Sequence, residues 1–138
     1  MRTISILSVC ILVFIAANAS AQQKIVRKEL YKANIGTQPI STVDVREVVF
    51  QPKQMTGLHR HPCPVISYIV EGTIGFQIRG EKVQIIHAGQ VGYEPAGAII
   101  EHFDNASDSA PAKFILYYLL NGQKELIEML PATHTKPQ

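Results

Sequence analysis

The sequence predicts an all-β protein, built as an antiparallel sandwich or barrel. Short runs of β-branched and aromatic residues follow one another from residue 43 onward, and turns rich in Gly and Pro separate them. No long helical pattern lies between these runs, which excludes alternating strand–helix units. The chain has 138 residues, of which 46% are hydrophobic and 17% charged, as expected for one globular domain.

The first 21 residues predict a signal peptide. Met1-Arg2 gives a positive start, residues 4–17 are almost wholly apolar, and Ala19-Ser20-Ala21 has the small residues that precede a cleavage site. The apolar run is shorter than the roughly 20 residues of a membrane span. A lipoprotein attached through Cys10 is the rival interpretation, but Val9 is bulky where a small residue is required. We therefore expect a mature protein that starts at Gln22, is periplasmic or secreted, and does not stay inserted in the membrane.

The mature chain divides into an arm, a strand-rich domain and a tail. Residues 22–42 carry charges and turn-forming residues and predict an arm with at most one short strand. Residues 43–130 predict the domain, in which only residues 123–130 have helical spacing, with Leu126, Met129 and Leu130 on one side. Residues 131–138 predict a flexible tail. The expected strands occupy residues 43–50, 65–70, 73–78, 83–86, 91–94, 99–103 and 114–120.

Charge and motif content exclude several classes of function. The net charge is +2, and the 13 basic residues are interspersed with 11 acidic ones instead of forming a basic stripe, which argues against nucleic-acid binding. The sequence has neither a phosphate-binding Walker loop nor a Gly-rich dinucleotide motif, which argues against a nucleotide-driven enzyme. Once the signal is removed, Cys63 is the one remaining cysteine, so no intramolecular disulfide is expected.

His59 and His61 form the sharpest chemical pattern. Residues two apart in a strand face the same way, so both imidazoles project together while Arg60 faces the opposite side. Two such rings can reach one metal ion at about 2.0–2.1 Å each, as in zinc sites. The alternative is that both are polar residues at a strand end. Cys63 is a weaker candidate ligand, because a lone buried thiol usually serves packing.

Two ordered motifs surround this pair. The first contains Gly57, His59, His61 and the strand that ends at Gly72, and the second contains Gly89, Pro95, Gly97 and Asn105. Together they resemble the cupin superfamily, in particular small single-domain bacterial cupins of type 2, over residues 43–120. The resemblance implies a double-stranded β-helix, or jelly-roll barrel. The helical spacing of residues 123–130 predicts a short C-terminal helix in addition. The resemblance also implies a metal site inside the barrel, a pocket for a small-molecule ligand and pairing of sheets into a homodimer.

The sequence departs from the family pattern at two expected ligands. Cupins usually place a Glu four or five residues after the second His, where this chain has Val65 and Ile66. Their last His usually follows the Gly of the second motif by three residues, which is Ile100 here. His102 comes two residues later and keeps the strand parity, so we expect it to be the third metal ligand, with a bulge absorbing the shift. Glu94 and Asp104 lie beside turns and are expected to be solvated.

A centre of three neutral imidazoles leaves the charge of a divalent ion uncompensated and favours transition metals such as zinc, iron, copper, nickel or manganese. Two classes of function stay open. The protein is either a small-molecule dioxygenase or isomerase, or a non-catalytic cupin that binds a small molecule or a metal at a degenerate site. The sequence assigns no catalytic residue.

Overall fold

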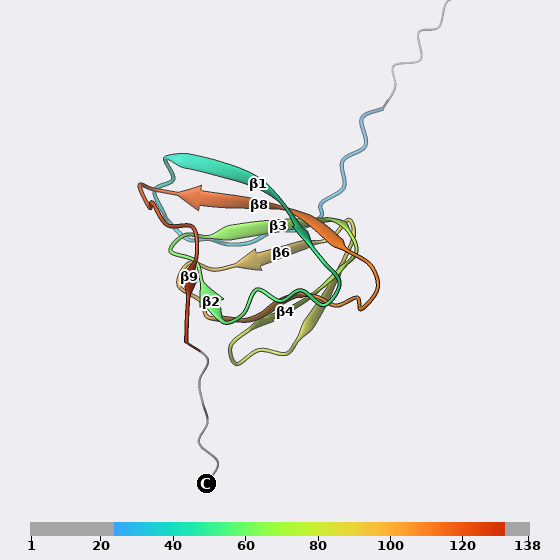
Figure 1. Cartoon of the computed structure of the whole chain (residues 1–138). Coiled ribbons are helices and arrows are strands. Elements are labelled where there is room, and N and C mark those ends of the chain that lie inside the picture. The colour runs from blue at the N-terminus through green and yellow to red at the C-terminus, as the bar shows by residue number, and fades with distance from the viewer. Residues whose placement is uncertain (1–23, 132–138) are drawn as a thin grey trace, which may run out of the picture.

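The computed structural model describes residues 24–131, and within this range the chain forms nine strands and no helix (Figure 1). The expected signal peptide and all of the expected tail except Pro131 lie outside the described residues. No helix of the described part is long and apolar enough to cross a membrane. The strands are β1 (Thr42–Phe50), β2 (His59–Arg60), β3 (Val65–Glu71), β4 (Thr73–Ile78), β5 (Gln84–His87), β6 (Val91–Glu94), β7 (Ile100–Asn105), β8 (Ala112–Leu120) and β9 (Glu128–Met129).

The strands form two antiparallel sheets that pack face to face (Figure 1). One sheet has the order β1-β8-β3-β6 and the other the order β5-β4-β7-β2-β9. The all-β prediction is confirmed. The predicted barrel takes the form of two open sheets, because each ends in free edge strands instead of closing on itself. The core and the cavity described below lie between these two sheets.

Strand β8 shows why these residues form half-buried strands. Its alternate residues Ala112, Phe114, Leu116, Tyr118 and Leu120 are all buried, whereas the residues between them are partly exposed. This period of two is the signature of a strand with one face on the core. All nine residues of β8 pair with β1, from Thr42 opposite Leu120 to Phe50 opposite Ala112.

An aromatic cluster fills one end of the space between the sheets. Phe114 of β8 packs edge to face against Phe50 and Phe103, with ring centres 4.9 and 5.1 Å apart. Phe76 of β4 extends the cluster through Phe103, at 6.0 Å. Edge-to-face aromatic pairs add to the stabilisation from apolar burial. The cluster therefore joins the two sheets rigidly beside the cavity.

The predicted C-terminal helix is wrong. Residues 128 and 129 form β9, which pairs with β2 through Arg60 opposite Glu128 and His59 opposite Met129. The Leu130 amide donates to the Leu58 carbonyl at 2.8 Å, and the Arg60 guanidinium binds the Glu128 carboxylate at 2.8 Å. β2 has only two residues, and the backbone groups on its edge away from β7 need hydrogen-bond partners. Pairing with this edge outweighs the helical spacing of the segment.

The described part of the N-terminal arm lies against the outer face of the four-stranded sheet. Residues 24–41 contain no strand, and β1 begins at Thr42. The Tyr31 ring lies 6.4 Å from the Tyr93 ring of β6, and Tyr31 borders a groove with Ile66 and Val91. The arm therefore covers the opposite side of this sheet from the core.

Candidate metal centre

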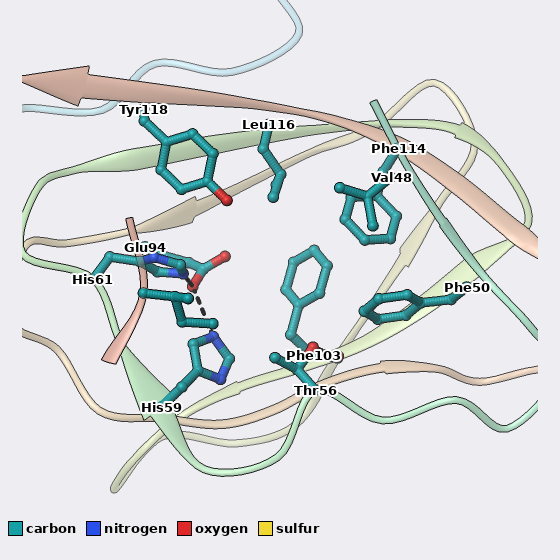
Figure 2. A pocket seen from close by; sticks show the side chains of 11 residues that line it. Val48, Phe50, Thr56, His59, His61, Glu94, Phe103, Phe114, Leu116 and Tyr118 are labelled. Carbon is teal, nitrogen blue, oxygen red and sulfur yellow. Dashed lines mark hydrogen bonds and ion pairs between the residues drawn. The ribbon is translucent and has the colours of Figure 1, made fainter. Parts of the chain in front are cut away.

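Three buried side chains converge between the sheets (Figure 2). His59 belongs to β2, His61 follows it directly, and Glu94 is the last residue of β6. Their exposed fractions are 2%, 4% and 2%. His61 Nε2 lies 3.1 Å and His59 Nε2 lies 3.5 Å from Glu94 Oε2, and one ligand atom of each residue lies within 4.8 Å of the others. The prediction that His59 and His61 project together is confirmed.

The local backbone explains how these side chains meet. Arg60 between the two histidines is exposed, as the alternation of a strand requires. On the facing sheet, Glu94 pairs with Val65 at the end of β6, directly before the turn at Pro95. This turn is tied to the histidine segment, because the Gly97 amide donates to the His61 carbonyl at 2.8 Å. One hydrogen bond therefore joins the two segments that carry the site.

The hydrogen bonds of the two rings fix which nitrogens carry lone pairs. His59 Nδ1 lies 2.7 Å from the Gly57 carbonyl oxygen, and His61 Nδ1 lies 2.5 Å from the Leu126 carbonyl oxygen. A carbonyl only accepts, so each Nδ1 carries the hydrogen, and each neutral ring presents an Nε2 lone pair. When both rings are neutral, both lone pairs face Glu94 Oε2, a buried atom that then has no hydrogen-bond donor. In this state three buried lone pairs meet at one point, an arrangement that a metal ion or a proton would stabilise.

The charges of the group are coupled. Burial alone would raise the pKa of Glu94, but the hydrogen bonds and charges of His59 and His61 outweigh it and hold that pKa below its ordinary value. Burial alone would lower the pKa of His61. The Glu94 carboxylate and the Leu126 carbonyl outweigh this effect and raise it. Both shifts favour a negative Glu94 beside a positive partner.

The donor set fits a divalent transition metal. Two imidazole nitrogens and one carboxylate on one side of an ion are typical of iron, zinc and related metals, and they leave further coordination positions open. The hydrogen bonds from Nδ1 to carbonyls are the outer contacts that orient metal-binding histidines. Glu94 also supplies one negative charge. In place of the expected three imidazoles, the structure brings together a candidate group of two imidazoles and one carboxylate.

The structure does not bring His102 into this group. Its ring is 44% exposed, and its Nδ1 lies 2.7 Å from Asp104 Oδ2. The reason is a β-bulge, because Gln77 pairs with His102 while its neighbour Ile78 pairs with Ile100, which leaves Glu101 as an extra residue. The bulge reverses the parity after Ile100, so Phe103 faces inward instead of His102.

Glu94 is a candidate ligand that the sequence alone does not predict. It was expected to be a solvated carboxylate beside a turn, but it is buried. The strand 91–94 is too short for its alternation to show which face is buried, and Gly92 has no side chain to mark the inner face. Cys63 is fully buried, burial raises the pKa of its thiol, and it is not part of the group.

The three residues form one wall of a cavity of about 190 Å³ (Figure 2). Six of its lining residues are apolar, two are Thr56 and Tyr118, and the others are the three candidate ligands. Tyr118 packs on His61, with ring centres 5.7 Å apart. The apolar lining residues are Val48, Phe50, Phe103, Phe114, Leu116 and Ile127.

Solved structures share the fold. A cupin-like protein from Thermotoga maritima is 25% identical, with a TM-score of 0.57, over 67% of this chain and 68% of that chain. The DMSP lyase DddQ from Ruegeria pomeroyi is 14% identical, with a TM-score of 0.55, over 70% of this chain and 45% of that one. A variant of the oxalate decarboxylase from Bacillus subtilis is 18% identical, with a TM-score of 0.55, over 64% of this chain and 24% of that one. The match thus spans less than half of each of these two enzymes.

No curated protein matches the sequence. The sequence does match the Cupin domain family over residues 46–118, which is more than half of the chain and includes both histidines and Glu94. The two packed antiparallel sheets and the cupin-like structural neighbour agree with this match. The chain therefore belongs to the cupin superfamily, as a small cupin domain of type 2.

Proposed function

We propose that this protein is an exported cupin enzyme that binds one divalent transition metal through His59, His61 and Glu94 and acts on a small organic molecule as a dioxygenase. The observation that carries the proposal is the convergence of three buried lone pairs on one wall of a mainly apolar cavity. Two histidines and one carboxylate are the donor set of non-haem iron(II) oxygenases. The bound metal would supply an open coordination position and Lewis acidity.

The side chains have distinct parts in this function. His59 and His61 are held in orientation by the carbonyls of Gly57 and Leu126, so they need little reorganisation to bind the ion. Glu94 reduces the positive charge of the centre by one. The apolar lining excludes water from the reacting molecule, which strengthens electrostatic interactions inside the cavity.

A non-catalytic binding protein is the second candidate. One observation favours it: among residues 24–131, no residue that lines the cavity is an acid or a base apart from the three candidate ligands and Tyr118. Isomerisation requires proton transfer by a positioned acid or base. The same observation therefore favours a dioxygenase over an isomerase as the candidate enzyme.

Metal analysis of the purified protein tests the centre. We expect about one transition-metal ion per chain, as a single site of three ligands requires. Glu94→Gln keeps the shape but removes the charge, and the His59→Ala/His61→Ala double variant removes both imidazoles, so both should lose the ion. His102→Ala is the matched control and should keep it. Loss of metal in His102→Ala, or full retention in Glu94→Gln, would overturn the assignment of the ligands.

Nitric oxide separates the two candidate functions. It occupies the position that dioxygen would take on iron(II) and gives a characteristic electron paramagnetic resonance signal of spin 3/2. We expect this signal from the protein loaded with iron(II) in the absence of air, and no signal from the double histidine variant. An iron-loaded protein that does not bind nitric oxide would leave only the binding function.

We also propose export and self-association. Export predicts that the protein recovered from outside the cytoplasm begins at Gln22, which intact-mass measurement checks. Self-association is supported by the edge strand β1, which exposes Val43, Val45 and Val49 on its outer face. We expect a homodimer in light scattering, and a monomer when Val43 and Val45 are both replaced by Thr.

A further inference from the structure

We infer that the ligand of this cavity is a small monocarboxylate with an apolar body, held between the metal centre and the Tyr118 hydroxyl. This ligand class rests on the proposed metal function. Three observations carry it: the charge of the centre, the free hydrogen-bond donor that Tyr118 offers in the cavity wall, and the apolar character of the remaining lining.

The charge of the centre favours a monoanion. A divalent ion with two neutral imidazoles and the Glu94 carboxylate has a net charge of +1. No Lys or Arg and no second carboxylate lines the cavity within the described residues. Charge left uncompensated in an apolar cavity costs free energy. A monoanion makes the complex neutral, whereas a dicarboxylate leaves one negative charge unpaired.

Arg46 is the cationic side chain to consider as a partner for a second carboxylate of the ligand. It lies on the same side of β1 as Val48, a lining residue. Its guanidinium, however, donates two hydrogen bonds to the Asp44 carboxylate, at 2.9 and 2.8 Å. Because Asp44 already neutralises this group, it does not offer a partner for a second ligand carboxylate.

Tyr118 provides the second contact for a carboxylate. Figure 2 shows its hydroxyl directed into the cavity, on the wall formed by β8. Among the hydrogen bonds of residues 24–131, none involves this hydroxyl, whereas the Thr56 hydroxyl donates to the Phe103 carbonyl at 2.7 Å. A carboxylate has two oxygens, so one can bind the ion while the other accepts from Tyr118. A ligand with a single oxygen would leave this donor unused.

The apolar walls and the volume of the cavity determine the polarity and the size of the rest of the ligand. The other walls of the cavity are formed by aromatic and aliphatic side chains such as Phe103, Phe114 and Leu116. The volume of about 190 Å³ is below the roughly 300–1,000 Å³ of sites for drug-sized ligands. A short aliphatic chain or one aromatic ring is therefore the appropriate size.

Butanoate and succinate provide a matched test, because they have the same number of carbons and differ in a terminal methyl against a second carboxylate. The protein is loaded with cobalt(II), whose visible absorption reports a change of ligands, and is titrated with each acid at neutral pH. We expect butanoate to change the spectrum and to bind at least about tenfold more tightly than succinate.

Two tyrosine variants test the contact. Tyr118→Phe should weaken butanoate binding by at least about tenfold, because a hydrogen bond to a charged group is lost, while its cobalt content stays unchanged. Tyr117→Phe is the matched control, since Tyr117 is on the outer face of β8 and should bind butanoate like the wild type.

The outcomes distinguish this inference from the function on which it rests. Equal affinity for succinate and butanoate, or a Tyr118→Phe variant that binds butanoate like the wild type, would overturn the ligand class while leaving the metal centre intact. A wild-type protein that takes up no cobalt would overturn the metal centre, and the ligand class with it.

Discussion

His61 Nε2 lies 3.1 Å from Glu94 Oε2, although His61 follows a strand of one sheet and Glu94 ends a strand of the other, and both side chains are almost completely buried. Any change in the charge of one is therefore felt by the other with little screening from solvent. A bound metal ion would supply the positive charge that balances Glu94. In the metal-free protein, a proton on His61 is the charge that can balance Glu94.

Removal of the metal should make stability depend on pH through this pair. The pKa of His61 is raised, so its contribution is present below its ordinary value of 6.5 and is lost as pH rises through the higher value in the folded protein. The pKa of Glu94 is lowered, so its contribution is present above its ordinary value of 4.5 and is lost as pH falls. The stabilisation from this pair is therefore fully present between pH 4.5 and 6.5.

Urea unfolding in the presence of a chelator checks this window. Wild-type protein should lose stability between about pH 5.5 and pH 8, and Glu94→Gln should lose markedly less. Identical pH profiles for the two proteins would contradict the coupling between His61 and Glu94.

The phenol of Tyr118 should ionise at a higher pH than that of an ordinary tyrosine. Burial, followed by the nearby Glu94 charge, raises its pKa to about 12 from an ordinary value of 10.0. The folded protein then holds this proton more tightly than the unfolded chain, so stability should fall as pH rises from 10.0 to about 12. The loss should be about 2 kcal/mol more in the wild type than in Tyr118→Phe. Alkaline unfolding of both proteins checks this, and parallel curves would contradict it.

Gly72 should be intolerant of any side chain. Its φ is +83°, and a Cβ there would lie 2.8 Å from the Pro111 carbonyl oxygen and 2.9 Å from the Ala112 Cα. Gly80 has a similar φ of +85° with nothing within 4 Å, so it is the matched control. Gly80→Ala should cost about 1–2 kcal/mol from backbone strain alone. Gly72→Ala should cost clearly more, because backbone atoms must also move, and equal thermal unfolding of the two variants would disprove this contact.

Asn105 should stabilise the loop between β7 and β8. Its side chain is buried, donates to the carbonyls of Gln51 and Ala110 at 3.0 and 2.8 Å, and accepts from the Ser107 amide at 3.0 Å. Asn105→Ala should reduce the free energy of unfolding by about 2–3 kcal/mol, because three part-buried hydrogen bonds to backbone groups are lost. The exposed Asn121 provides the control, and its Ala variant should unfold close to the wild type. A small effect at Asn105 would mean that water replaces these bonds.

Much of the fold was predictable because it follows from short-range patterning. The alternation in β8 and in β3 shows which residues face the core, and glycines mark the turns between strands. The same alternation placed His59 and His61 on one face with Arg60 opposite. All of these features depend on neighbours within a few residues along the chain.

The remaining features depend on pairing between distant segments. Residue spacing at 123–130 favoured a helix, but the free edge of β2 recruits residues 128 and 129 into a strand. The two-residue period of a strand favoured His102 as an inward-facing ligand, but the bulge at Glu101 turns its side chain outward. Glu94 reaches the histidines only because β6 pairs with β3 and its sheet packs on the sheet that contains β2. Local periodicity specifies which way a side chain faces, whereas strand register and sheet packing decide which side chains from the two sheets meet at the candidate metal site.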